Sequence, residues 1–581
     1  MQLEDRKLAF YRHKEAVLLL VLAIAAPLAF ALYTGNIWED YFITFRHSQH
    51  LCEGKGLVYN VGERVHGFTS PLGVLLPALC YFVTGQTSYV PALWLFRALC
   101  IAAFVSGGWL VLRKIIEAGS SRWTTYAFVL LYCLEAKTLA FSVNGMETAL
   151  MLLFVGWTVF LWDRQSPRTW LWRGIAWAGL MWTRPDGCIY IAALAITEMF
   201  WGLGNRRRLL LSYLKSAGLT TVIYLPWLLF AIWYYGSAIP QTIQAKTPVG
   251  IGDLGVGGLL ERIYFMLPHR AAYAYAPIYF PTFWLDGPDW VYKFTYATGI
   301  FALVYWLLPV NDRFGRTASF CFTMLSLYVA YVALPFPWYL PPVTLFASIT
   351  FSRGIVTLAN SIAGSAAANG LVARASQART ALALCCLGFA ILGVGVLAVL
   401  GMTVKQIYVQ EHEIEMGNRR EIGLWLKDHV HADETVFLEP IGYIGYFSQV
   451  KIVDWPGLVS PRVVQLRREG VTLEKMPNEL KPNWVIFRPH EVKKLVGENP
   501  SFLTHYQPIK VFDVKRKLRQ YEPIPGENYV KLDSTFLVFK RKTSPDETAV
   551  PADLQSSARE CDLYVSQLLA SPEQSRWMGG S

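Results

Sequence analysis

The chain has 581 residues, of which 54% are hydrophobic and only 16% are charged. Soluble domains carry about 25% charged residues, so this composition excludes an ordinary soluble protein. The net charge of +11 would be compatible with nucleic-acid binding in a soluble protein, but here we attribute it to cytoplasmic loops, which collect Lys and Arg in membrane proteins. The nine cysteines lie mostly in apolar segments and show no metal-ligand spacing, so they predict neither a disulfide framework nor a metal site.

Long apolar runs predict an α-helical polytopic membrane protein. A helix needs about 20 apolar residues to cross the hydrocarbon core, and by this criterion the sequence contains about eleven spans. The first follows a basic N-terminal stretch and is predicted to be retained rather than cleaved. The approximate limits of the spans are 15–34, 89–112, 123–142, 146–163, 169–183, 187–203, 213–235, 290–310, 316–334, 339–359 and 380–403.

The positions of the basic residues predict the orientation of these spans. Lys and Arg gather at the N-terminus and in alternate loops, which places all of these clusters on the cytoplasmic side. The N-terminus is then cytoplasmic, and the C-terminal region is periplasmic or extracellular. The apolar run 71–85 is too short to span and would invert the later helices if it did, so we predict an interfacial or re-entrant helix at the outer face. The loop clusters lie within 113–122, 164–168, 206–215, 313–316 and 374–379.

The domain organisation follows from these spans. We expect a transmembrane module over residues 1–405, with a first outer loop at 35–90 and a second at 236–289. Residues 406–542 alternate short β-like runs with helical stretches, which indicates an extracytoplasmic α/β domain. The expected strands are 435–438, 451–454, 484–487 and 536–540, and the expected helices include 419–429 and 490–496. Residues 543–581 are polar and aperiodic, which is typical of a flexible tail.

The first outer loop holds the residues most suited to catalysis. Glu39 and Asp40 are adjacent just after the first helix, and Arg46 follows Glu39 by seven residues, about two helical turns. Adjacent carboxylates repel, which raises the pKa of one of them. A carboxylate near an apolar boundary can act as a general base. The alternative is that the pair caps an interfacial helix, and local chemistry leaves both interpretations open.

Several motifs occur in one order along the chain and resemble those of a known family. They are EDYFITFR from residue 39, GKGLVYNVGERVHGFTS from 54, GMET from 145, TRPDG from 183, PQTIQAK from 240, IGYFS from 444 and VDWPGL from 453. In this order they resemble the GT-C superfamily of membrane glycosyltransferases, and most of all the branch that contains bacterial cell-wall arabinofuranosyltransferases. The resemblance covers roughly residues 10 to 540. It departs from the family pattern at Glu39, where Asp is common, at Val61 in place of Pro, and at Gln241 in place of Asn.

The resemblance implies an inverting glycosyltransferase of the cell (inner) membrane. Such an enzyme takes a sugar from a polyprenyl-phosphate donor and passes it to an extracytoplasmic glycan, lipid or protein acceptor. No cofactor and no nucleic acid are expected. No metal site is recognisable in the sequence, and a monophosphate donor needs none in principle, since Arg and Lys can neutralise the leaving group. Carried onto this sequence, it implies that Glu39 or Asp40 is the catalytic base and that cations bind the donor phosphate, as Arg and Lys commonly do. The implied substrate-binding residues are Arg46, His66, Arg184, Gln241 and Lys246.

The same residues also allow other interpretations. Arg46 is also expected to pair with the carboxylates of the same loop, Arg184 to be a cation at a helix end near the membrane surface, and His66 or Lys246 to be an ordinary loop residue. For the whole chain, the alternatives are a transporter or flippase of lipid-linked sugars and a non-catalytic scaffold. A transporter would be expected to show two related halves with broken helices, and none is recognisable in this sequence.

Overall fold

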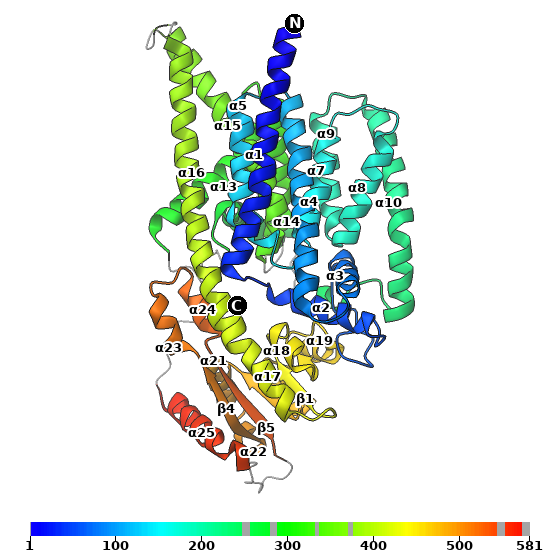
Figure 1. Cartoon of the computed structure of the whole chain (residues 1–581), viewed down its shortest axis with the longest axis vertical. Helices are drawn as coiled ribbons and strands as arrows, with labels where there is room; N and C mark the ends of the chain where they lie inside the picture. The colour runs from blue at the N-terminus through cyan, green and yellow to red at the C-terminus, as the bar shows by residue number, and fades with distance from the viewer. Residues whose placement is uncertain are drawn as a thin grey trace. The chain divides into compact units, whose positions relative to one another are not determined.

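The computed structural model describes residues 2–246, 256–278, 287–331, 336–369, 373, 376–542 and 552–571. The chain forms two compact units (Figure 1). Unit 1 comprises Met1–Trp38, Thr69–Ala238 and Gly250–Tyr408, and unit 2 comprises Glu39–Phe68, Ile239–Val249 and Val409–Ser581. Each unit is therefore assembled from segments that are far apart in the sequence.

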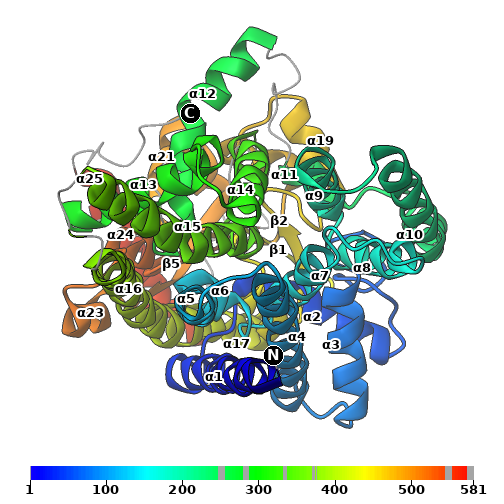
Figure 2. The ribbon, with the colours of Figure 1, turned by 90° about the horizontal axis from the view of Figure 1, so that it is seen from above.

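Unit 1 is a bundle of helices. Within it α4 packs against α7, α8 against α10, and α14 against α15 (Figure 2). Its helices are α1 (Gln2–Thr34), α3 (Leu72–Val83), α4 (Tyr89–Glu117), α5 (Arg122–Leu134), α6 (Ala136–Phe141), α7 (Thr148–Phe160), α8 (Thr169–Thr183), α9 (Gly187–Trp201), α10 (Arg206–Tyr235), α12 (Val256–Ala272), α13 (Asp289–Val304), α14 (Arg313–Tyr331), α15 (Pro341–Ala368) and α16 (Gln377–Val409).

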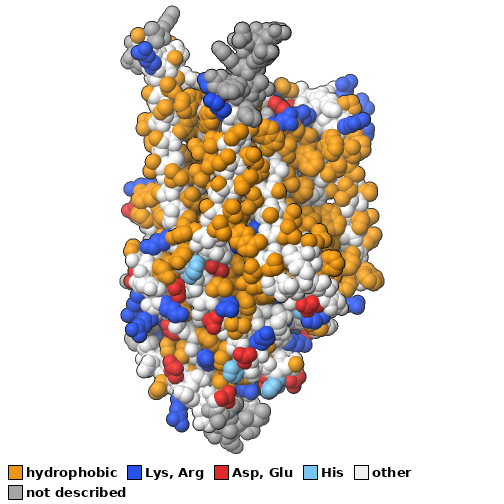
Figure 3. Space-filling model, viewed as in Figure 1, with side chains coloured by type: hydrophobic (Ala, Val, Ile, Leu, Met, Phe, Trp, Pro, Cys, Tyr) orange, Lys and Arg blue, Asp and Glu red, His pale blue; other side chains and the backbone are white. Residues whose placement is uncertain are grey.

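The helices of unit 1 are those of a multi-pass membrane protein. Within the described residues, five helices are long and apolar enough to cross a membrane, and three shorter ones, including α3, are also apolar. Hydrophobic side chains cover most of the visible face of the long helices (Figure 3). Each of the eleven predicted spans overlaps at least one helix in the described part of the chain, but five long helices do not confirm a count of eleven crossings.

Small residues allow close packing inside this bundle. A Cβ atom on Gly107 of α4 would lie 2.8 Å from the carbonyl oxygen of Leu152 in α7, and one on Gly156 would lie 2.7 Å from the carbonyl oxygen of Gly107. The backbones of α4 and α7 therefore lie so close together that only glycine fits at these two positions. Helices commonly associate within lipid through such small residues.

Polar contacts bring together several of the loops that the sequence places on one side. Arg164 forms an ion pair with Glu117 at 2.7 Å, and Arg313 forms one with Asp163 at 2.8 Å. Arg313 also donates a hydrogen bond to the carbonyl oxygen of Trp201. The loops after α4, α7 and α9 and the start of α14 thus meet at one end of unit 1, as the charge pattern predicts. Arg374, in the last basic cluster, lies outside the described residues.

Unit 2 is built around a five-stranded sheet with the order β2-β1-β3-β5-β4. Strand β1 (Thr435–Leu438) is parallel to both β2 (Lys451–Asp454) and β3 (Trp484–Phe487), whereas β5 (Thr535–Arg541) is antiparallel to β3 and to β4 (Tyr506–Asp513). Its helices are α2 (Glu39–Cys52), α11 (Gln241–Lys246), α17 (Arg420–His429), α18 (Tyr443–Ser448), α19 (Pro461–Arg468), α20 (Met476–Leu480), α21 (Pro489–Glu498), α22 (Phe502–His505), α23 (Lys515–Leu518), α24 (Glu527–Leu532) and α25 (Gln555–Ala570). A π-helical segment, Gln410–Arg419, leads into α17.

Alternating side chains of the strands form two cores, one on each face of the sheet, as the period of a β-strand requires. One core includes Leu438 and Val538 with Trp425 of α17. The other includes Phe437 and Leu537 with residues of α19, α21 and α25.

The structure differs from the sequence prediction in three places. Strand β4 was not expected, and α25 packs on the sheet through Cys561 and Val565 where a flexible tail was predicted. The third difference concerns residues 39–68 of the first outer loop, which belong to unit 2, the unit that holds the sheet. There the Tyr59 hydroxyl donates to the carbonyl oxygen of Ile441 at 2.7 Å, and the Asn60 side chain pairs with both backbone groups of Ile452 in edge strand β2.

Candidate active site

The two predicted catalytic carboxylates begin helix α2. Glu39 and Asp40 occupy its first turn, where the positive end of the helix dipole favours acidic groups. The aromatic residues that follow, Tyr41, Phe42 and Phe45, are fully buried. Phe42 also packs edge-to-face against Tyr443 of α18, with ring centroids 4.6 Å apart. The carboxylates therefore stand on a helix that is fixed by aromatic packing within unit 2.

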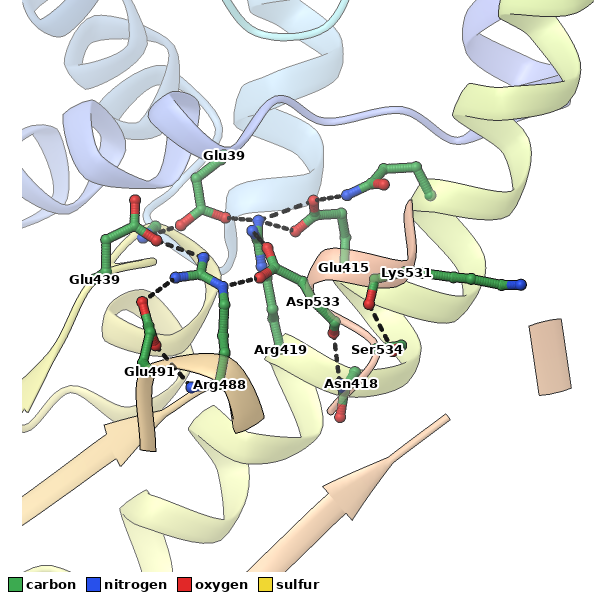
Figure 4. Close-up of polar contacts among 12 residues, drawn as sticks. Glu39, Glu415, Asn418, Arg419, Glu439, Arg488, Glu491, Lys531, Asp533 and Ser534 are labelled. Carbon is green, nitrogen blue, oxygen red and sulfur yellow. Dashed lines mark hydrogen bonds and ion pairs between the residues drawn. The ribbon is translucent and has the colours of Figure 1, made fainter. Parts of the chain in front are cut away.

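The Glu39 carboxylate accepts hydrogen bonds on both of its oxygens. The Gly442 N–H donates to Oε1 at 2.6 Å, and the Arg419 Nη1 donates to Oε2 at 2.6 Å (Figure 4). A Cβ atom at Gly442 would lie 2.2 Å from the Glu39 carbonyl oxygen, so this close approach requires glycine. The Glu39 side chain keeps 19% of its surface exposed, so the carboxylate is held in place but remains accessible.

Arg419 joins Glu39 to a larger buried network. Its guanidinium group also pairs with Glu415 at 2.9 Å and with Asp533. Asp533 in turn pairs with Arg488, which completes the network by binding two further glutamates, Glu439 and Glu491. The guanidinium groups of Arg419 and Arg488 therefore pair with five carboxylates (Figure 4).

This excess of negative charge in a buried place separates the pKa values of the carboxyl groups. Burial raises the pKa of Glu39 to about 8; the Arg419 charge opposes the rise, and Glu415 and Asp40 add to it. Burial likewise raises the pKa of Glu415. Asp533 lies between two guanidinium groups, and they hold its pKa at about 2 although the group is buried. A carboxyl group with a pKa near neutrality, such as Glu39, is suited to accept and release a proton.

Arg46 binds backbone groups within unit 2 through its side chain. Its side chain is buried, and it donates hydrogen bonds from Nη1 to the carbonyl oxygen of Gly445 at 2.6 Å and from Nη2 to that of Val450 at 2.8 Å. Its guanidinium group also lies over the Tyr59 ring, 4.3 Å from the centroid. These contacts fix the IGYFS motif to α2. No described ion pair joins Arg46 to a carboxylate, so the pairing expected within its own loop is not seen. The substrate contact of Arg46 stays a prediction.

His66 and Gln241 lie together in unit 2. The backbone N–H of Gln241 donates to the carbonyl oxygen of His66 at 2.9 Å. The Gln241 side chain donates to the carbonyl oxygen of Gly457, in the VDWPGL motif, at 3.2 Å. Burial lowers the pKa of His66 to about 4, so the imidazole is neutral at pH 7. Three of the quoted motifs, far apart in sequence, therefore meet in one place.

Lys246 ends helix α11 in the same unit. The residue before it is held by Arg467, whose Nη1 donates to the carbonyl oxygens of Ala245 and Pro456, both at 2.8 Å. The Arg467 guanidinium group also lies over the Trp455 ring, 5.0 Å from its centroid. The backbone around Lys246 is thus tied to the loop that follows strand β2.

Arg184 belongs to unit 1, where it follows α8. Its Nε and Nη2 donate to the two oxygens of Asp186 at 2.9 and 3.1 Å, and its guanidinium group lies 4.2 Å from the centroid of the Tyr339 ring. The Tyr328 hydroxyl also donates to Asp186, at 3.1 Å. Arg184 is buried and forms a bidentate ion pair with Asp186. It therefore differs from an exposed cation at a helix end near the membrane surface.

The structure adds residues that sequence reasoning did not select, above all Arg419, Asp533 and Arg488. The four-residue spacing of Glu415 and Arg419 is compatible with a helical ion pair, but no spacing links either residue to Glu39 or Asp533. Within the described residues, no three His, Cys, Asp or Glu side chains are grouped so that they could hold a metal ion.

A family described as Domain of unknown function (DUF8728) matches residues 405–538. The Terminal beta-(1->2)-arabinofuranosyltransferase of Mycobacterium tuberculosis is 27% identical to this chain over 245 residues, which are 37% of this chain and 35% of that protein. The sequence match thus spans about a third of that relative.

Two solved structures share the fold over almost the whole chain. The crystal structure of ArnT from Cupriavidus metallidurans bound to undecaprenyl phosphate has a TM-score of 0.50 at 11% identity, and the alignment covers 92% of this chain and 99% of ArnT. The oligosaccharyltransferase of Archaeoglobus fulgidus, tethered with an acceptor peptide, has a TM-score of 0.51 at 12% identity over 94% of this chain and 77% of that one. The chain therefore has the GT-C membrane fold with a small C-terminal sheet domain, which confirms the fold class that the motifs predicted.

Proposed function

We propose that this chain is an inverting glycosyltransferase that moves a sugar from a polyprenyl-phosphate donor to an extracytoplasmic glycan, lipid or protein acceptor. The observation that carries the proposal is the accessible Glu39 carboxylate, held by Arg419 and Gly442 beside Asp40, in a chain with the GT-C fold. Further support comes from the arabinofuranosyltransferase relative and from the undecaprenyl phosphate bound to ArnT.

The proposed reaction is a single displacement. A carboxylate of the Glu39–Asp40 pair takes the proton of an acceptor hydroxyl, and the acceptor oxygen attacks the anomeric carbon. The bond from that carbon to the phosphate oxygen breaks, and polyprenyl phosphate leaves with the bonding electrons. Attack from the face opposite the leaving group inverts the anomeric configuration.

The leaving phosphate needs positive charge, and we assign this task to Arg184 and Lys246. Arg suits a bidentate phosphate contact and Lys acts as a point charge. Asp186 holds Arg184 at two donors, which fixes the guanidinium plane. Gln241 begins the helix that ends at Lys246, and its backbone N–H bonds the carbonyl oxygen of His66, so we assign Gln241 and His66 to shaping the substrate site. A monophosphate leaving group can be stabilised by these cations alone, and the proposed reaction uses no cofactor and no metal.

The proposed orientation places the N-terminus in the cytoplasm and the sheet of unit 2 outside an inner membrane, so that transfer takes place on the outer side. Reporter fusions made after Arg207 and after Glu421 are expected to report opposite sides of the membrane. If both report the same side, the assignment of the helices to crossings is wrong.

The decisive experiment uses the purified full chain in liposomes with radiolabelled polyprenyl-phosphate arabinofuranose, chosen because of the arabinofuranosyltransferase relative. Glu39→Gln and Asp40→Asn remove charge but keep size. The variant that lacks the base should lose about 10²–10⁴-fold in single-turnover rate, and the other should lose less. Wild-type rates in both variants would rule out the Glu39–Asp40 pair as the catalytic base.

The same preparation tests the transporter alternative, to which the relatives reported above lend no support. Glycosyl transfer leaves the label on a new acceptor molecule. Transport moves the labelled lipid between the leaflets of the bilayer and forms no new bond. Label that crosses the bilayer and stays on the polyprenyl phosphate would favour the transporter.

A further inference from the structure

We infer that Arg419 is a positioning residue for the reaction proposed above, which orients Glu39 and sets the pH at which Glu39 gives up its proton. The inference rests on the proposed function, and it assigns a task to a residue of the segment between α16 and α17, far from the first outer loop in sequence. Arg419 acts through Glu39, so no contact between Arg419 and the substrate is required.

The geometry supports this assignment in two ways. Arg419 is buried, and a single guanidinium group is shared by Glu39, Glu415 and Asp533. With Gly442, it fixes both oxygens of Glu39, so the carboxylate cannot rotate without losing a charge-assisted hydrogen bond. Such bonds are among the strongest in proteins.

The local backbone explains how the segment presents these groups. Gln410–Arg419 is π-helical, a conformation that is rare and is often found at functional sites. In this segment Glu411, Glu415 and Arg419 are all buried, and the Gln410 side chain donates to Glu415 at 2.8 Å. The segment therefore turns two carboxylates and one guanidinium group inward, toward the interior of unit 2.

The charges around Glu39 determine the sign of each effect. Arg419 stabilises the ionised form of Glu39, whereas Glu415 and Asp40 destabilise it. Tyr59 and Tyr443 interact with this carboxylate electrostatically, although their hydroxyl groups donate to the Ile441 carbonyl oxygen and to Glu411. Asp533 is linked to Glu39 through Arg419. Removing the Arg419 charge should raise the pKa of Glu39, and removing the Glu415 charge should lower it.

Two opposite shifts therefore form the test. Because a base must be deprotonated to act, the rising limb of the pH–rate profile should move to higher pH in Arg419→Gln, by about 1–3 pH units. It should move to lower pH in Glu415→Gln. In Arg419→Lys, which keeps the charge but has a single nitrogen, the limb should stay near its wild-type position while turnover falls. Glu413→Gln is the matched control, because Glu413 lies in the same segment but accepts its hydrogen bond from the Tyr521 hydroxyl, at 3.0 Å. The rising limb of the pH–rate profile of this variant should not move.

A second measurement separates this inference from the proposed function. Infrared difference spectra between wild type and Glu39→Gln, recorded through a pH titration of the full chain in detergent, report the protonation of the Glu39 carboxyl group directly. Glu415→Gln is an almost isosteric change and keeps this titration measurable if Arg419→Gln does not fold. If no sugar is transferred but the titration shifts in opposite directions in the two variants, the glycosyltransferase proposal fails and the coupling stands. If sugar is transferred but neither the titration nor the rate profile shifts, Arg419 has only a structural role and the inference is overturned.

Discussion

Asp533 offers a quantitative test of the buried network, because it is the only described carboxylate that pairs with both Arg419 and Arg488. Asp533→Asn keeps the shape of the side chain but leaves the two guanidinium groups without this anion. Removing one partner of a buried ion pair costs about 3–5 kcal/mol. We therefore expect the free energy of unfolding of unit 2 to fall by about that amount at pH 7.

The pH dependence of this difference follows from the pKa of Asp533, which drops from its ordinary value of 3.8 to about 2. A lowered pKa means that the folded state favours the ionised form, so this stability is present above about pH 4 and is lost as the pH falls toward 2. The difference between the ordinary and the lowered pKa of Asp533 corresponds to about 2 kcal/mol, since one pKa unit is worth about 1.4 kcal/mol. Glu39 and Glu415 have raised pKa values and act in the opposite direction, so the contribution of Asp533 appears only in a comparison with its variant.

The assay is denaturant unfolding of the detergent-solubilised protein, followed by hydrogen exchange in strands β3 and β5 at several pH values. The stability difference between wild type and Asp533→Asn should shrink by about 2 kcal/mol between pH 5 and pH 2. Asp562→Asn is the control, because Asp562 is exposed on α25 and such surface changes usually stay within about 0.5 kcal/mol. A difference that stays constant over this pH range would refute the bridging role of Asp533.

Two further changes test the contacts that hold α2. Arg46→Met removes two charge-assisted hydrogen bonds to carbonyl oxygens, so the free energy of unfolding of unit 2 should fall by about 3–6 kcal/mol. Equilibrium binding of the sugar donor to the folded fraction should stay unchanged. Normal stability together with weakened donor binding would instead favour a substrate-binding role for Arg46. Gly442→Ala places a Cβ atom 2.2 Å from the Glu39 carbonyl oxygen, so kcat should fall with little change in KM. Gly497→Ala is the control, because no atom lies within 4 Å of its Cβ position, and it should match wild type in both constants. Equal kcat values in the two variants would contradict the close approach of Gly442 to Glu39.

The sequence predicted best the elements whose signals are local. The bounds of β1, β2 and β3 agree with the predicted runs, because each is a short run with buried side chains on at least one face. Strand β4 contains Pro508 and several polar residues, and it lies at the edge of the sheet, where such residues are tolerated. Helix α25 buries only Ala558, Cys561 and Val565, a stripe too narrow to be recognised within a polar segment.

The candidate site could be predicted only in part, for the same physical reason. The acidic pair at the start of α2 is visible in the sequence because its two members are adjacent. Arg419 lies 380 residues from Glu39, and the pattern of either segment contains nothing that reports their contact. The long side chain of Arg46 resembled a substrate ligand in the sequence, whereas in the structure its Nη1 and Nη2 atoms donate to two backbone carbonyl groups.

Residues 39–68 belong to unit 2, so the sheet domain includes a segment from the N-terminal part of the chain. The family match begins at residue 405 and ends at 538, so it omits this segment. Without the segment, the backbone N–H and carbonyl groups of Ile452 in edge strand β2 would lose the Asn60 side chain that pairs with them, and an open strand edge invites wrong pairing. The carbonyl oxygens of Ile441 and Gly445 would also lose the donors Tyr59 and Arg46. The matched domain therefore lacks contacts that the first outer loop supplies. Because the same loop carries the proposed base, we expect the sheet domain and the Glu39–Asp40 pair to fold as one unit.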